Sequence, residues 1–157
     1  MALTVELDAG AMALRVGAAL VAGAVVGIDR ELKRKPAGMR THALVAIGAC
    51  VVVLLTIGQS AEDPDAVSRA IQGIITGVGF LGAGVIMQRE AEGRVEGLTT
   101  AASIWVTSAL GMACGAGQLD LVLIALIAAV LVMVGGESVE RRLTRMKRPR
   151  EGPPEAR

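Results

Sequence analysis

Aromatic residues and cysteines are nearly absent from this 157-residue chain, which contains one Phe, one Trp, no Tyr and two Cys. Two cysteines are too few for the dense disulfide framework of a small secreted domain. The formal net charge is only +1, so the total charge gives no reason to expect nucleic-acid binding. Hydrophobic residues make up 53% of the chain, a fraction that excludes an intrinsically disordered protein.

Charged residues are missing from five long stretches. These are residues 16–28, 43–58, 70–88, 97–119 and 121–136. A helix on the surface of a soluble protein carries polar residues on one face, whereas an apolar run of about 18 residues can cross a membrane. Five buried helices would leave almost no chain to cover them in a soluble protein. We therefore predict an all-α, polytopic membrane protein, a bundle of about five transmembrane helices.

The basic residues lie mainly on one side of the predicted spans. Segments 29–40, 89–97 and 137–157 hold 14 of the 16 Lys and Arg residues, and only Arg15 and Arg69 lie on the other side. Cytoplasmic loops are enriched in Lys and Arg. We therefore predict an N-terminus outside and a C-terminus in the cytoplasm.

The predicted organisation has three parts: an N-terminal segment (1–10), a transmembrane domain (11–136) and a basic cytoplasmic tail (137–157). A basic cluster beside a membrane attracts anionic lipids. We therefore expect the tail to bind membrane lipids through Arg141, Arg142, Arg145, Lys147 and Arg148.

The first helix is expected to continue past the membrane surface to Lys35. Pro36 would end it, because proline lacks the amide donor and clashes with the preceding turn.

Glycines are concentrated in the third uncharged stretch. Gly77, Gly79 and Gly82 match the GxGxxG pattern, but a dinucleotide site needs this pattern between a strand and a helix, so we reject nucleotide binding. Gly73 and Gly77 form a GxxxG pair, which lets neighbouring helices approach closely. The same spacing recurs at residues 23–27 and 111–115. We therefore predict that the third helix is the crowded central helix.

A second interpretation of this stretch remains open. Glycine-rich segments at membrane depth sometimes unwind and expose carbonyl groups to an ion. The glycines that would pack against helices or line an ion path are Gly73, Gly77, Gly79, Gly82 and Gly84.

A polar cluster is predicted where the first two helices meet on the cytoplasmic side. Its members are Asp29, Arg30, Glu31, Arg40, Thr41 and His42. Such residues could serve only as interfacial anchors, or they could bind a cation or a partner protein. Magnesium prefers one or two carboxylates with water, so Asp29 and Glu31 are candidate ligands.

No catalytic constellation is apparent, because the chain has one His and no Cys–His or Ser–His–Asp arrangement placed to meet. We expect a protein that is not an enzyme and has no cofactor other than a possible magnesium ion. The uncharged stretches also lack carboxylates, which argues against a coupled transporter.

A further motif marks the start of the fourth helix, at Gly97, Leu98, Thr99 and Thr100. Ser103 and Thr107 add hydroxyl groups along the same helix. Each hydroxyl can bond to a backbone carbonyl one turn back, so none requires a substrate.

Four segments taken together resemble the MgtC/SapB family of bacterial inner-membrane proteins. They are residues 23–31 (GAVVGIDRE), 37–42 (AGMRTH), 77–86 (GVGFLGAGVI) and 95–102 (VEGLTTAA). The resemblance covers residues 11–136. Asp29 replaces the first Glu of the family's Glu-Arg-Glu-like run, which shortens one carboxylate side chain without removing it.

The resemblance implies a multi-pass protein of the bacterial inner (plasma) membrane that is linked to growth at low magnesium, with virulence factors among its relatives. It implies regulation of ions and ATP by contact with other membrane proteins, or alternatively a magnesium channel or transporter. Expected partners are lipids, other inner-membrane proteins or a second copy in a homo-oligomer, and not nucleic acid. Many relatives carry a soluble C-terminal domain, and we expect this chain to be a short form without it.

Overall fold

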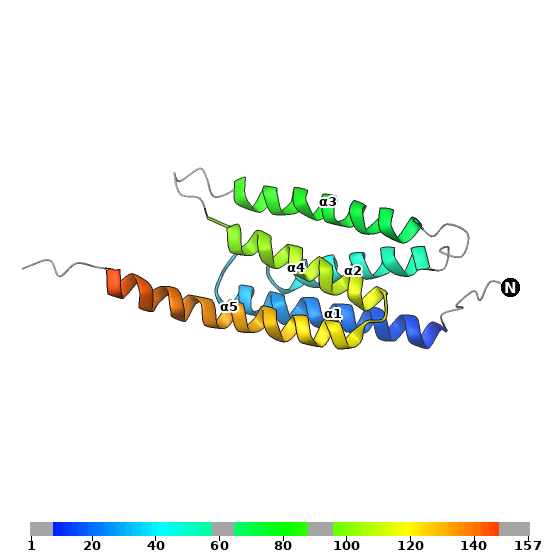
Figure 1. Cartoon of the computed structure of the whole chain (residues 1–157), viewed down its shortest axis with the longest axis horizontal. Helices are drawn as coiled ribbons and strands as arrows, with labels where there is room; N and C mark the ends of the chain where they lie inside the picture. Colours follow the sequence, from blue (N-terminus) through cyan, green and yellow to red (C-terminus); the bar gives the residue numbers. More distant parts are fainter. Residues whose placement is uncertain (1–7, 58–64, 88–95, 148–157) are drawn as a thin grey trace, which may run out of the picture.

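The described residues of the chain form five α-helices. The computed structural model describes residues 8–57, 65–87 and 96–147, and no strand occurs in these three ranges (Figure 1). The helices are α1 (Ala9–Leu32), α2 (Met39–Ile57), α3 (Ala66–Met87), α4 (Leu98–Gly115) and α5 (Leu119–Lys147). This confirms the predicted all-α class.

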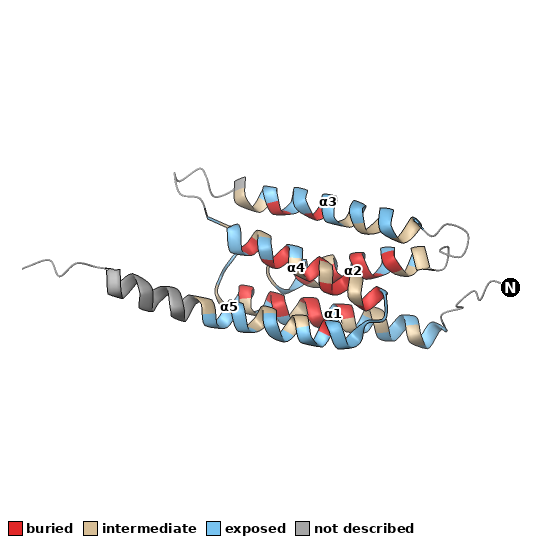
Figure 2. Cartoon of the chain, in the orientation of Figure 1, coloured by how far each residue is buried: buried red, intermediate tan, exposed pale blue. Residues whose placement is uncertain are grey.

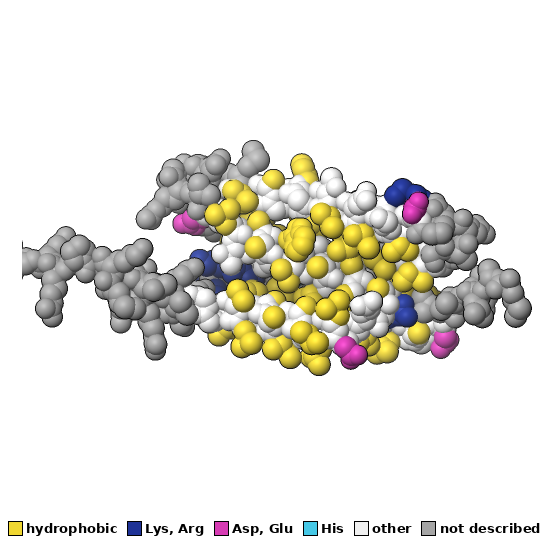
Figure 3. All heavy atoms as spheres, viewed as in Figure 1, with side chains coloured by type: hydrophobic (Ala, Val, Ile, Leu, Met, Phe, Trp, Pro, Cys, Tyr) yellow, Lys and Arg dark blue, Asp and Glu magenta, His cyan; other side chains and the backbone are white. Residues whose placement is uncertain are grey.

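Each helix is long and apolar enough to cross a membrane. Figure 3 shows hydrophobic side chains over the middle of the visible face, with the charged side chains of the described residues toward the two ends. This is the distribution of a multi-pass membrane protein, since charges are costly at the bilayer centre. The five predicted spans are confirmed, while the orientation of the termini stays a prediction.

The core lies between α1, α2 and α4 and is built from small side chains (Figure 2). Its buried members are Ala19, Ala22 and Val26 of α1, Ala46 and Cys50 of α2, Leu110 and Cys114 of α4, and Val122 of α5. In a membrane, helices associate by close van der Waals packing, because lipid is as apolar as the side chains. Alanine and cysteine allow such close packing, and both cysteines are free thiols.

Glycines let two helices approach the backbone of α2. A Cβ atom at Gly23 would lie 2.6 Å from the carbonyl oxygen of His42, and one at Gly27 would lie 2.5 Å from the Cα of Met39. On α4, a Cβ at Gly115 would lie 2.6 Å from the carbonyl oxygen of Cys50, and one at Gly111 would lie still closer to the carbonyl oxygen of Ala46. The predicted role of these two GxxxG pairs in helix packing is therefore confirmed.

The prediction that the third helix is central is wrong. Half of the apolar segment of α4 that could span a membrane is buried, against 11% of the corresponding segment of α3, so α4 is the central helix. Helix α3 lies along one edge of the bundle (Figure 1). A Cβ at Gly82 would contact Ala101 at 3.4 Å, but Cβ atoms at Gly73, Gly77, Gly79 and Gly84 would meet nothing within 4 Å. Within the described chain, these four glycines do not pack against another helix.

The first helix ends earlier than expected, at Leu32 rather than Lys35. The amide of Lys35 donates to the carbonyl of Arg30 at 2.9 Å, and the amide of Arg34 donates to Glu31 at 3.0 Å. These are the two hydrogen bonds of a Schellman motif, which closes a helix with a left-handed residue. Arg34 takes that conformation with φ of 51°. Backbone capping therefore ends the helix before Pro36 is reached.

Candidate functional site

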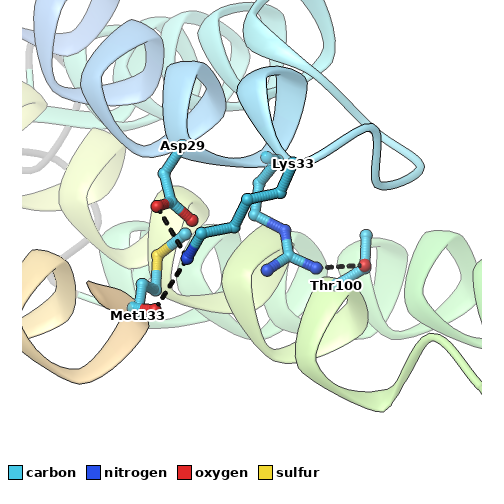
Figure 4. Close-up of polar contacts among 5 residues, drawn as sticks. Asp29, Lys33, Thr100 and Met133 are labelled. Atoms are coloured by element: carbon cyan, nitrogen blue, oxygen red, sulfur yellow. Dashed lines mark hydrogen bonds and ion pairs between the residues drawn. The ribbon is translucent and has the colours of Figure 1, made fainter. Parts of the chain in front are cut away.

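The predicted polar cluster lies where α1 turns into α2, but its side chains point in different directions. Asp29 of α1 and Lys33, which directly follows α1, form an ion pair at 2.9 Å. The Nζ of Lys33 also donates to the backbone carbonyl of Met133 on α5 at 3.0 Å (Figure 4). Lys33 thus links α1 to α5. The second carboxylate oxygen of Asp29 is buried without a hydrogen-bond partner among the described residues.

Arg30 points into the bundle and is only 4% exposed. Its Nη2 donates to the hydroxyl of Thr100 on α4 at 2.8 Å (Figure 4). Its Nε is buried and has no hydrogen-bond partner within the described residues. Taking an ion out of water costs several kcal/mol, so a buried guanidinium supported by a neutral hydroxyl is a demanding arrangement. Arg30 therefore fixes α1 against α4 and places positive charge inside the bundle.

Glu31 serves the start of α2. Its Oε2 accepts a hydrogen bond from the amide of Met39 at 3.0 Å. The first amides of a helix lack partners within that helix, and a carboxylate satisfies them well. A Cβ at Gly38 would lie 2.9 Å from this same oxygen, so glycine leaves the room that the carboxylate needs.

His42 joins α2 to α4 and is completely buried. Its Nδ1 lies 3.0 Å from the carbonyl oxygen of Gly38, and its Nε2 lies 3.0 Å from the hydroxyl of Ser103. A carbonyl oxygen only accepts, so Nδ1 carries the proton of a neutral imidazole and Nε2 accepts from Ser103. The Ser103 hydroxyl also lies 2.8 Å from the carbonyl of Thr100, but its single proton serves one acceptor at a time.

Glu31 is exposed but caps α2, and the side chains of Arg40 and Thr41 are exposed as well. Arg40 and Thr41 lie on the first turn of α2, beside the buried His42. They form the part of the cluster that another molecule can touch without unpacking the bundle.

The motif that opens α4 has a structural explanation in the chain. Gly97 is left-handed, with φ of 92°, and its carbonyl accepts from the amide of Ala101 at 2.8 Å. Leu98 and Thr99 are exposed, whereas Thr100 is buried against Arg30. One turn further than Ser103, the Thr107 hydroxyl is fully buried with no partner among the described residues.

No group of three or more His, Cys, Asp or Glu side chains is placed to hold a metal in the described ranges. The carboxylate of Asp29 is paired with Lys33, and that of Glu31 caps α2. Magnesium binding by these two residues stays a prediction, and it would have to replace both contacts.

A second arginine links α1 to α4 at the opposite end of the bundle. Nη1 of Arg15 donates to the carbonyl of Gly115 at 2.8 Å. Arg15 and Arg30 are as far apart in α1 as Thr100 and Gly115 are in α4. Because the two helices run antiparallel, one register satisfies both arginines, and buried Val26 and Ile104 follow the same register.

Of the predicted lipid-binding tail, residues 141–147 belong to the end of α5, and Arg148 lies outside the described residues.

Four contacts between helices were not expected from the sequence: Lys33 with Met133, Arg15 with Gly115, Arg30 with Thr100, and His42 with Ser103. The hydroxyls of α4 were interpreted as able to bond to carbonyls of their own helix, as Ser108 does with Trp105. The sequence does indicate a polar face of α4, because Thr100, Ser103 and Thr107 recur at the spacing of one helix face.

Comparison with known proteins gives matches over most of the chain. The profile of the MgtC family matches residues 16–142. Protein SrpB of Synechococcus elongatus is 41% identical over 140 residues, which are 83% of this chain and 77% of that protein. Protein MgtC of Salmonella typhimurium is 39% identical over 139 residues, 88% of this chain and 58% of that protein. Protein SapB of Bacillus subtilis is 40% identical over 111 residues, 66% of this chain and 47% of that protein. No solved structure matches.

Proposed function

Because this chain belongs to the MgtC family, we propose that it is a non-enzymatic inner-membrane protein for adaptation to low magnesium. It acts on ion and ATP homeostasis by contact with other membrane proteins. The magnesium link is carried over from the family resemblance. The chain spans 58% of the Salmonella MgtC protein, so the activity of the whole relative is part of the proposal.

One observation favours contact over transport: the charged side chains at the α1–α2 turn hold helices together. Lys33 holds α5, Arg30 holds α4 and Glu31 holds α2. The charge buried between α1 and α4 is that of Arg30 and is positive. A divalent cation about 5 Å from a guanidinium is repelled by about 7 kcal/mol at an effective dielectric constant of about 20. The helix packing itself therefore opposes cation passage at this point.

The alternative is a magnesium channel or transporter whose third helix is broken at its glycines. Helix α3 is continuous from Ala66 to Met87, which does not favour this alternative. Magnesium entry into liposomes that contain only the purified protein tests it. We expect entry no faster than into empty liposomes. Saturable entry that is lost in an Asp29→Asn, Glu31→Gln double variant would overturn the contact proposal and establish transport.

Growth at low magnesium tests the contact itself. The exposed Arg40 is the residue to change, because its side chain is not part of the buried packing. In a strain lacking the protein, Arg40→Glu should fail to restore growth although it reaches the wild-type amount in the membrane. The control Asp120→Lys changes an exposed charge at the start of α5 and should restore growth. Full growth with Arg40→Glu would remove Arg40 from the contact surface.

A further inference from the structure

We propose that α3 is the surface through which two copies of this chain pair in the membrane. The proposal is independent of any role in magnesium adaptation. It starts from a stripe formed by Gly73, Gly77, Phe80 and Gly84, which recur at intervals of four, three and four residues. In an α-helix these positions stay within about 60° of one face. We call this face the α3 stripe.

The α3 stripe points away from the rest of the chain. Val78 and Gly82, which are buried, lie on the opposite face of the helix, where Gly82 approaches Ala101. Cβ atoms at the three glycines of the stripe would meet nothing within 4 Å in the described chain, and Phe80 is 81% exposed. The face that holds α3 in the bundle is therefore a different one from the stripe.

Glycine pairs elsewhere in this chain show what a glycine-lined helix face packs against. The two GxxxG pairs within α1 and α4, at residues 23–27 and 111–115, each lie against the backbone of α2. Glycine inside a helix costs about 1 kcal/mol relative to alanine, and close helix contact is what offsets this cost. On α3 the cost is present without a contact inside the described chain. The shape of the stripe thus fits another transmembrane helix.

Two features select a second copy as that helix. First, the stripe carries both a projection and depressions, since Phe80 stands one turn from Gly77 and one turn from Gly84. A two-fold interface requires a surface that complements itself. Two copies inserted in the same orientation have parallel α3 helices, so a two-fold axis along the membrane normal places each Phe80 against glycines of the other copy.

Second, the charges at the start of α3 complement themselves. Asp65 and Arg69 are exposed, of opposite sign and one turn apart, with Arg69 one turn before Gly73. In a parallel pair, each Arg69 comes within a turn of the other copy's Asp65. The rest of the stripe is uncharged, so the two copies meet without net repulsion.

Energy transfer between fluorescently labelled copies of the full chain in liposomes tests the proposal. The protein-to-lipid ratio is varied, and the half-maximal ratio of transfer is measured. Gly77→Leu should raise this ratio at least tenfold, because the side chain fills the depression. The matched control Gly48→Leu should not change it, since Gly48 of α2 is also exposed with nothing within 4 Å of a Cβ. The pairing would be overturned if energy transfer in the wild type were no greater than random proximity predicts. It would also be overturned if both variants had the same half-maximal protein-to-lipid ratio.

Oxidative cross-linking keeps the proposal testable if Gly77→Leu fails to fold. Thr76 borders the stripe and is exposed, so Thr76→Cys should give a covalent dimer. Leu131→Cys, on the exposed surface of α5, should remain monomeric, as should the unmodified chain, whose Cys50 and Cys114 are buried. Equal cross-linking at positions 76 and 131 would refute pairing through α3, and would leave a different membrane protein as the occupant of the stripe.

Discussion

Gly27→Ala should destabilise the protein, although the same substitution at Gly48 should stabilise it. A Cβ at Gly27 would lie 2.5 Å from the Cα of Met39. Carbon atoms in contact are separated by about 3.5–4.0 Å, so α2 would have to withdraw from α1 by about 1 Å. At Gly48 the new methyl group meets nothing within 4 Å.

The magnitude follows from three effects at Gly27. Overpacking of this kind costs about 1–3 kcal/mol. The hydrogen bond from Met39 to Glu31, now 3.0 Å, would lengthen beyond the normal range and lose about 1 kcal/mol, since it is solvent-exposed. The gain in helix propensity is about 1 kcal/mol. The net loss is about 1–3 kcal/mol for Gly27→Ala, against a gain of about 1 kcal/mol for Gly48→Ala, where only propensity acts.

Unfolding in mixed micelles, followed by circular dichroism as the fraction of denaturing detergent rises, measures this difference. The two variants should fall on opposite sides of the wild type. The reasoning about close packing between α1 and α2 would be refuted if Gly27→Ala were as stable as Gly48→Ala.

Three further predictions use the same assay. Arg34→Gly should stabilise the protein by up to about 1 kcal/mol. At φ of 51° the strain of a residue with a Cβ atom costs more than the additional conformational entropy that glycine loses on folding. A destabilised variant would contradict this account. Thr100→Val should cost about 1–3 kcal/mol, because it removes the hydroxyl that accepts from buried Arg30, and Thr99→Val, at an exposed position, should change little. Ser103→Ala should cost a similar amount by leaving Nε2 of His42 without a partner, and Ser103→Thr should retain most of the stability if the hydroxyl is what matters.

The positions of the helices could be predicted from the sequence, whereas which helices pack against one another could not. Charge-free stretches locate membrane spans because a charge is costly in lipid wherever the helix lies. A glycine pair indicates a flat helix face but does not say what covers it. For this reason Gly23, Gly27, Gly111 and Gly115 were correctly expected to pack, while the same pattern at Gly73 and Gly77 led to the wrong central helix.

The site shows the same division. The sequence identified Arg30 and His42 as polar residues near one end of the bundle, because both stand beside a charge-free stretch. It did not indicate that both point inward to α4, since their partners Thr100 and Ser103 are 70 and 61 residues away. The contact of Lys33 with Met133 was beyond prediction for another reason, because the acceptor is a backbone carbonyl and carries no residue signature.

The shared register of Arg15 and Arg30 has a consequence for the surrounding lipid. Fifteen residues separate the two arginines, which corresponds to about 22 Å along the helix axis. The hydrocarbon layer of a typical bilayer is about 30 Å thick. Arg30 is held by Thr100 and cannot extend its side chain toward the surface. The protein therefore suits a thinner membrane than average, and in an ordinary one it draws the two lipid surfaces closer together around itself.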